Sequence, residues 1–107
     1  MSDKFWIGVQ KEDTGFLLSR ECAIFRAAFL RIKKAQNEFP LFAEDEFHAS
    51  SLLTEEVGEL ARVLNDAHNE PEKIREHIER AKDEILDVIT VAVRLCLMLE
   101  KNGGGSE

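Results

Sequence analysis

The chain has 107 residues, of which 44% are hydrophobic and 33% are charged, a composition that indicates one soluble helical domain. Its 21 Asp and Glu against 14 Lys and Arg give a net charge of −7, which argues against nucleic-acid binding because phosphate backbones would be repelled. The apolar run over residues 85–99 is interrupted by Asp87, Thr90 and Arg94 and is too short to span a bilayer. With no signal-peptide pattern at the start, we expect a cytoplasmic protein without a membrane segment.

Residues 1–18 precede the first clear helical pattern. They carry an apolar cluster at Phe5, Trp6, Ile7 and Val9, followed by a turn pattern near residues 13–15. The segment is compatible with an arm that packs on a neighbouring subunit and with a short extra helix, and both interpretations stay open.

Helical periodicity then predicts an all-α domain over residues 19–101. A first helix is expected from about residue 16 or 19 to 37, and Phe39-Pro40 should end it because the residue before proline avoids the α region. A second helix is expected over residues 45–68 and a third over 71–101, with Pro71 in its first turn. Residues 102–107 are rich in glycine and are expected to be a flexible tail. Cys22 and Cys96 sit among apolar neighbours and are expected to be buried free thiols.

Two pairs of acids interrupt the apolar stripes of the second and third helices. At 100° per residue, Glu56 falls inside the stripe of the second helix and Glu59 at its edge, while Glu84 and Asp87 repeat this arrangement on the third. The short connection makes the two helices antiparallel neighbours, so the two pairs lie at similar heights. Four converging carboxylates suit magnesium or manganese. Scattered, solvated acids are the alternative for each pair taken singly.

Gly58 lies in the middle of the second helix beside these acids, where glycine costs about 0.5–1 kcal/mol relative to alanine. A close approach between helices or space for a ligand would account for it. A surface glycine without such a role is the alternative.

The motif Glu-Glu-x-x-Glu at residues 55–59, followed after an interval by Glu-x-x-Asp at 84–87, resembles the MazG-type all-α nucleoside triphosphate pyrophosphohydrolases. The resemblance covers about residues 19–101. It implies magnesium-dependent hydrolysis of a nucleoside triphosphate to the monophosphate and pyrophosphate by a homodimer or homotetramer. It assigns Glu56, Glu59, Glu84 and Asp87 as metal ligands. Either Glu55 or Glu59 would be the catalytic base, and Glu55 is otherwise a supporting or solvated group.

Several basic side chains are candidates for holding the substrate phosphates. Arg31, Lys33 and Lys34 lie near the end of the first helix, and Arg80 and Arg94 lie on the third. Arg80 is also placed to pair with Glu84 four residues later. His77 lies on the apolar stripe, where it would either touch substrate or pack in the core. For each cation, a solvated or paired surface position is the alternative.

The third helix is apolar on nearly every side between residues 85 and 99, so we expect it to be buried on nearly every side. Three helices cannot achieve this alone, which predicts a four-helix-bundle-like core completed by a second copy. Two alternatives to the MazG-type function remain: a phosphoribosyl-ATP pyrophosphohydrolase-like enzyme, and a non-catalytic helical dimerisation module. A di-iron carboxylate protein would need Glu-x-x-His pairs, which the sequence lacks.

Overall fold

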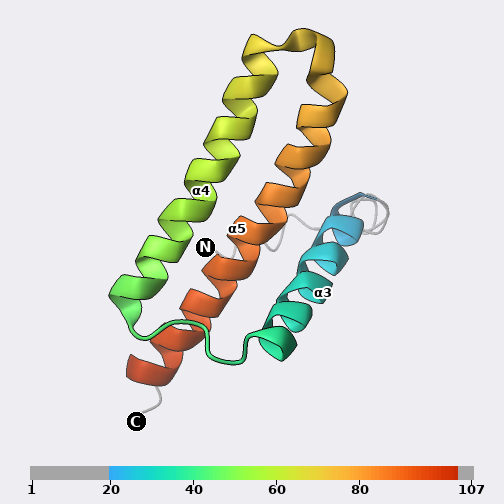
Figure 1. The fold of residues 1–107 in the computed structure, drawn as a ribbon. Coiled ribbons are helices and arrows are strands. Elements are labelled where there is room, and N and C mark those ends of the chain that lie inside the picture. Colours follow the sequence, from blue (N-terminus) through green and yellow to red (C-terminus); the bar gives the residue numbers. More distant parts are fainter. Residues whose placement is uncertain (1–19, 104–107) are drawn as a thin grey trace, which may run out of the picture.

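The computed structural model describes residues 20–103, and every regular element in this range is helical (Figure 1). In chain order they are α3 (Cys22–Glu38), α4 (Glu46–Asn69), the short 3-10 helix η2 (Pro71–Lys73) and α5 (Ile74–Gly103). The all-α prediction is therefore confirmed for this part of the chain. The predicted arm over residues 1–18 lies outside the described residues, as do residues 104–107. Among the helices described, none combines the length and apolar character needed to cross a membrane.

The helix boundaries follow local signals in the sequence. The side chain of Asp45 caps α4, with Oδ1 accepting a hydrogen bond from the backbone N–H of His48 at 2.8 Å. Pro71 opens the next element as expected, but its first turn is 3-10 and the α-helix begins only at Ile74. The last helix continues to Gly103, two residues beyond the predicted end at Lys101.

Helices α4 and α5 form a long antiparallel hairpin closed by η2, and α3 runs beside α5 in the same direction as α5 (Figure 1). Within residues 20–103, α3 packs on α5, and no Cα atom of α3 lies within 8 Å of one of α4. The backbone of α3 therefore does not pack closely on α4.

Small residues fill the contacts between these helices. The buried apolar positions of the described chain are Ala28 on α3, Ala49 and Val63 on α4, and Ala81 on α5. Alanine at a crossing allows the backbones to approach closely, but it buries little apolar surface. No large side chain in the described range is fully buried. The core formed by residues 20–103 is therefore thin.

One side of the hairpin is apolar and exposed. Val57 and Leu64 on α4 are 47% and 53% exposed, and Ile78 and Ile85 on α5 are 44% and 41% exposed. On each helix, the two residues lie about a quarter turn away from the face that contacts the other helix of the hairpin. The direction of this rotation about the helix axis is the same for α4 and α5. Because α4 and α5 are antiparallel, the same sense places both pairs on one side of the hairpin. With Ile74, also exposed, these residues form what we call the hairpin apolar face.

The expectation that α5 is buried on nearly every side is not met within one chain. Leu97 and Leu99 are 47% and 50% exposed, and Cys96 is exposed as well. Cys22 is half-buried, and both cysteines are free thiols. The predicted burial of Cys96 is therefore wrong for the single chain, because none of the helices within residues 20–103 packs against the side of α5 on which it lies.

Candidate metal centre

Three of the predicted metal ligands meet between α4 and α5. Glu56 on α4 and Glu84 and Asp87 on α5 each offer a carboxylate oxygen, and these atoms all lie within 4.8 Å of one another. All three residues are half-buried. The helical periodicity and the antiparallel hairpin thus bring together acids that are far apart in the sequence, and we call Glu56, Glu84 and Asp87 the carboxylate cluster.

Two oxygens of the cluster are buried without a hydrogen-bond partner. They are Oε2 of Glu56 and Oε2 of Glu84. Leaving a buried acceptor unsatisfied costs about 1–3 kcal/mol, and more when the group is charged. A cation or a proton at this position would remove that cost, since each would give these oxygens a partner.

The electrostatics of the cluster reflect burial and like-charge crowding. Burial raises the pKa of Glu56, and the neighbouring charges of Glu59 and Asp87 raise it further. Burial also raises the pKa of Glu84, again with added contributions from Glu59 and Asp87. Both carboxyl groups are therefore harder to ionise than a solvated glutamate.

The remaining acids of the motif lie around this cluster. Glu59 is half-buried and close enough to Glu84 for its charge to be the second cause of that residue's raised pKa. Glu55 is exposed, and its charge is the weakest of the causes that raise the pKa of Glu56. The structure thus places Glu59 at the edge of the cluster and Glu55 on its solvent side.

Arg31 is the predicted phosphate-binding residue that lies closest to the cluster. Its Nη1 donates to Asp87 Oδ1 at 2.9 Å and to the backbone oxygen of Asp83 at 2.9 Å, while Nη2 donates to Asp83 Oδ1 at 2.6 Å. These acids raise the pKa of Arg31 above its ordinary value, the hydrogen bond to Asp83 being the largest cause. Sequence reasoning missed this pairing, although the spacing of four residues between Asp83 and Asp87 places both on one side of α5.

Lys34 and Lys33 occupy different surroundings on α3. Lys34 is exposed and lines a hollow of about 270 Å³ together with Arg31, Asp83 and Asp87. Lys33 lies over the ring of Phe29, 5.4 Å from its centroid. Lys34 is thus beside the cluster.

Arg94 holds the end of α3 against α5. Its Nη1 donates to the backbone oxygen of Ala35 at 3.3 Å and its Nη2 to that of Phe39 at 2.5 Å. The guanidinium carbon also lies 5.0 Å from the ring centroid of Phe42, and burial lowers the pKa of Arg94. These contacts satisfy carbonyls near the C-terminus of α3.

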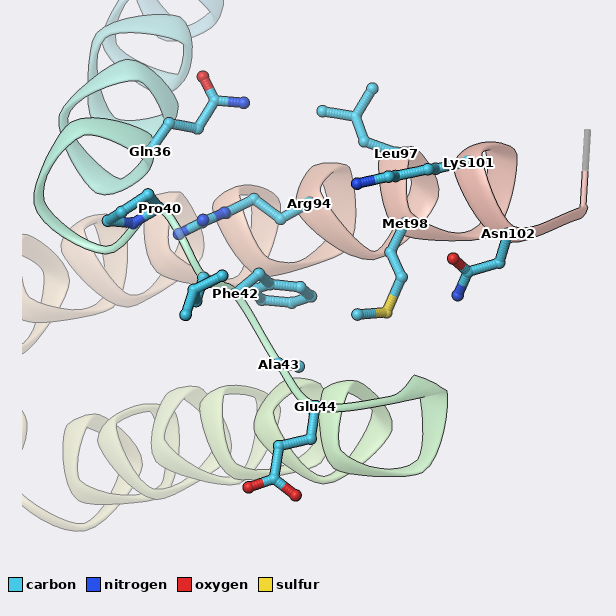
Figure 2. Close-up of a pocket in the computed structure, with 11 residues that line it drawn as sticks. Gln36, Pro40, Phe42, Ala43, Glu44, Arg94, Leu97, Met98, Lys101 and Asn102 are labelled. Atoms are coloured by element: carbon cyan, nitrogen blue, oxygen red, sulfur yellow. The ribbon is translucent and has the colours of Figure 1, made fainter. Parts of the chain in front are cut away.

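Arg94 and Phe42 line an open hollow of about 570 Å³ between the α3–α4 connection and the end of α5 (Figure 2). Met98 extends from α5 toward the connection (Figure 2), and Lys101 and Glu44 also line the hollow. The hollow is two or more helical turns beyond Asp87 along α5.

His77 and Arg80 belong to a polar network near the turn of the hairpin. His77 is 5% exposed; its Nε2 lies 2.9 Å from Glu70 Oε1 and its Nδ1 lies 3.2 Å from Arg80 Nη1. Arg80 also lies 4.0 Å from Asp66 of α4. Because an arginine can only donate, Nδ1 accepts and a neutral ring carries its proton on Nε2.

Of the two interpretations of His77, the structure agrees with the packed histidine. The ion pair of Arg80 with Glu84, one of the alternatives that the spacing allowed, is not formed, because the Arg80 side chain lies near Asp66 and His77 instead. A Cβ at Gly58 would meet nothing within 4 Å. A close approach by the described residues therefore does not account for this glycine.

The donor set fits a small divalent cation. Carboxylate oxygens are the ligands that magnesium and manganese prefer, and two of those present are buried without a partner. Comparisons of the chain with protein-family models, curated proteins and solved structures find no match.

Proposed function

We propose that the protein is a magnesium-dependent nucleoside triphosphate pyrophosphohydrolase. The observation that supports this most is the carboxylate cluster, in which oxygens of three acids from two helices lie within 4.8 Å and two of them are buried without a partner. Like charges gathered in this way lower the stability of the fold. A function that requires them together therefore explains the arrangement better than a purely structural role does.

In the proposed reaction Glu56, Glu84 and Asp87 hold magnesium, with Glu59 as a further ligand from the edge of the cluster. Manganese would substitute because it prefers the same ligands. When bound, the ion neutralises charge on the triphosphate oxygens and lowers the pKa of a water molecule. A water molecule activated in this way would attack the α-phosphorus, the bond from that phosphorus to the α–β bridging oxygen would break, and pyrophosphate would leave. Glu59 or Glu55 accepts the proton.

The same geometry supports a place for the substrate's phosphates. Glu55 and Glu59 lie on the side of the hairpin on which α3 packs, where the backbone of α3 does not pack closely on α4. Lys34 projects from α3 beside Arg31 and Asp87. In this proposal Lys34 contacts the phosphates, and Lys33, Arg80, Arg94 and His77 act elsewhere in the molecule.

The proposal includes a homodimer formed through the hairpin apolar face. Five large apolar side chains, each more than 40% exposed, lie along two helices on one side of the hairpin. A second copy that presents the same face would build a four-helix core by the isologous pairing usual for dimers. A charge at its centre should break the pairing, so light scattering at micromolar concentration should give a dimer for the wild type and a monomer for Ile78→Glu. A monomeric wild type would contradict this part of the proposal.

The central experiment is a screen of ribo- and deoxyribonucleoside triphosphates for product formation with magnesium. We expect the monophosphate and pyrophosphate, not the diphosphate and phosphate. Glu56→Gln keeps the shape of the side chain but removes a ligand charge, and should lower turnover by more than about a hundredfold. Glu76→Gln is the matched control, because Glu76 is an exposed acid on α5 away from the cluster.

The outcomes separate the competing functions. Wild-type turnover by Glu56→Gln would refute the assignment of the ligands. Turnover of phosphoribosyl-ATP alone would favour that related enzyme class. No pyrophosphate release from any triphosphate, together with a stable dimer, would favour the helical dimerisation module.

A further inference from the structure

We propose that Arg31 is a positioning residue that holds the side chain of Asp87 in the carboxylate cluster and thereby couples α3 to cation binding. The inference rests on the proposed function in one respect: it takes the cluster to be a cation site. The role differs from phosphate binding, which the sequence suggested for Arg31, because the guanidinium is already engaged by acids of this chain.

The geometry of Arg31 fixes Asp87 relative to the backbone of α5. Nη1 is shared between Asp87 Oδ1 and the backbone oxygen of Asp83, each at 2.9 Å. Nη2 donates to Asp83 Oδ1 at 2.6 Å, which holds the guanidinium plane in place. One rigid group therefore joins the Asp87 carboxylate to the helix turn before it.

Asp87 needs such a restraint because its neighbours repel it. Its side chain is 37% exposed, so solvent is accessible to it, whereas the oxygens of Glu56 and Glu84 lie within 4.8 Å on the other side. The charge of Asp87 is among the causes that raise the pKa of both glutamates. Without Arg31, rotation of Asp87 toward water would relieve this repulsion and take a ligand away from the cluster.

The restraint comes from a helix that supplies no acid to the cluster. Within the described chain, α3 packs closely on α5 alone, and Ala28 is its one buried apolar residue. The hydrogen bonds of Arg31 are therefore among the contacts that attach the middle of α3 to α5. As a result, the attachment of α3 to α5 and the orientation of the Asp87 side chain depend on the same hydrogen bonds.

The positive charge of Arg31 and the shape of its guanidinium act in opposite directions on cation binding. The charge lies beside the cluster and disfavours a second cation, whereas the planar group orients Asp87. Lysine keeps the charge but has one nitrogen, which cannot reproduce the shared and parallel hydrogen bonds. Glutamine removes the charge as well as most of the hydrogen bonds. Positioning therefore predicts a larger loss of affinity for Arg31→Lys than for Arg31→Gln.

The test measures Mn²⁺ binding to the metal-free protein by calorimetry and by the spin-resonance signal of free Mn²⁺. We expect Arg31→Lys to bind about tenfold more weakly than the wild type, a size typical of residues that orient metal ligands. Arg31→Gln should lose less. Arg26→Lys is the matched control, since Arg26 is exposed on the same helix and should bind as the wild type does. Equal affinity of Arg31→Lys and the wild type would overturn the inference.

A second readout needs no metal. The coupling constants between the α and β protons of Asp87 report whether the side chain occupies one rotamer or several. We expect one rotamer in the wild type and averaged values in Arg31→Lys, with circular dichroism showing that the helices are retained. If the wild type did not bind Mn²⁺ but showed this difference, the proposed function would fail and the positioning role would stand. Averaged values already in the wild type would refute the positioning role.

Discussion

Removing one charge from the carboxylate cluster should stabilise the metal-free protein at neutral pH. The substitution Glu84→Gln removes one such charge. The substitution keeps the side-chain shape while it eliminates the repulsion with Glu56 and Asp87, whose oxygens lie within 4.8 Å of Glu84. It also replaces a buried, unpartnered carboxylate oxygen by an amide that can donate to a neighbouring carboxylate.

The magnitude follows from Coulomb's law. Two unit charges at this separation repel by about 0.9 kcal/mol in bulk water and by about 3.5 kcal/mol at an effective dielectric constant of about 20. Since the cluster is half-buried and reached by solvent, the lower end applies, and we expect a gain of about 1–2 kcal/mol in the free energy of unfolding. For a domain of this size that raises Tm by at least about 4–8 °C.

Magnesium should stabilise the wild type more than Glu84→Gln and so narrow the difference in the free energy of unfolding between the two proteins. At about ten times the dissociation constant, binding to the native state stabilises the wild type by about 1.4 kcal/mol, whereas Glu84→Gln should gain less than about a third of that. Thermal unfolding followed by circular dichroism, with and without magnesium at one protein concentration, measures both effects. The control is Glu76→Gln on the exposed side of the same helix. The reasoning is refuted if Glu84→Gln is no more stable than the wild type without the ion.

Three further predictions test other parts of the structure. The folded-state pKa of Glu56 and of Glu84 is raised above 4.5, so the native state binds more protons than the unfolded state. In urea titrations, the free energy of unfolding of the wild type should therefore fall as pH rises from about 4.5 through the raised pKa values. A difference in stability between the wild type and Glu84→Gln that does not change with pH over this range would contradict the prediction. Gly58→Ala should add about 0.5–1 kcal/mol, read from the denaturation midpoint, because the new methyl group meets open space; a loss would show that something outside the described residues packs there. Arg94→Gln should lower the free energy of unfolding by about 1–2 kcal/mol, because α3 loses its hydrogen bonds to Arg94. Amide exchange should speed up more at the end of α3 than in α4. An equal increase in exchange in both helices would show that Arg94 does not hold α3.

Much of the helical framework could be predicted from the sequence because its signals are local. The cap at Asp45, the break at Pro40 and the start at Pro71 each act within one turn of the helix they bound. Among the boundary details that differ are the 3-10 first turn of the last predicted helix and its extension to Gly103. Both concern end geometry, which periodicity does not determine.

The meeting of Glu56 with Glu84 and Asp87 was also predictable, because the hairpin connection is short and fixes the relative heights of the two helices. The partners of the basic residues were not. Arg31 and Arg94 both reach between α3 and α5, and the placement of α3 against α5 depends on tertiary packing that no local pattern encodes. Long side chains can reach several acids and carbonyls, so sequence spacing alone did not identify the partner of Arg80.

The two unusual features of the hairpin lie on different sides of it. Relative to the contact between α4 and α5, the hairpin apolar face is displaced in one rotational sense, and Glu59 and Asp87 are displaced in the other. A second copy could therefore cover Val57, Leu64 and Ile78 without closing the acidic side to a substrate. Because the core formed by residues 20–103 is thin, pairing through the hairpin apolar face would stabilise the protein. Because Glu56 and Glu84 have buried oxygens without a partner, a cation bound on the opposite side would stabilise it as well. Dimer formation and cation binding would both stabilise α4 and α5. Ile78→Glu should therefore lower the apparent affinity for Mn²⁺, even though Ile78 lies away from the cluster. An unchanged affinity in a variant shown to be monomeric would indicate that the two sides of the hairpin act independently.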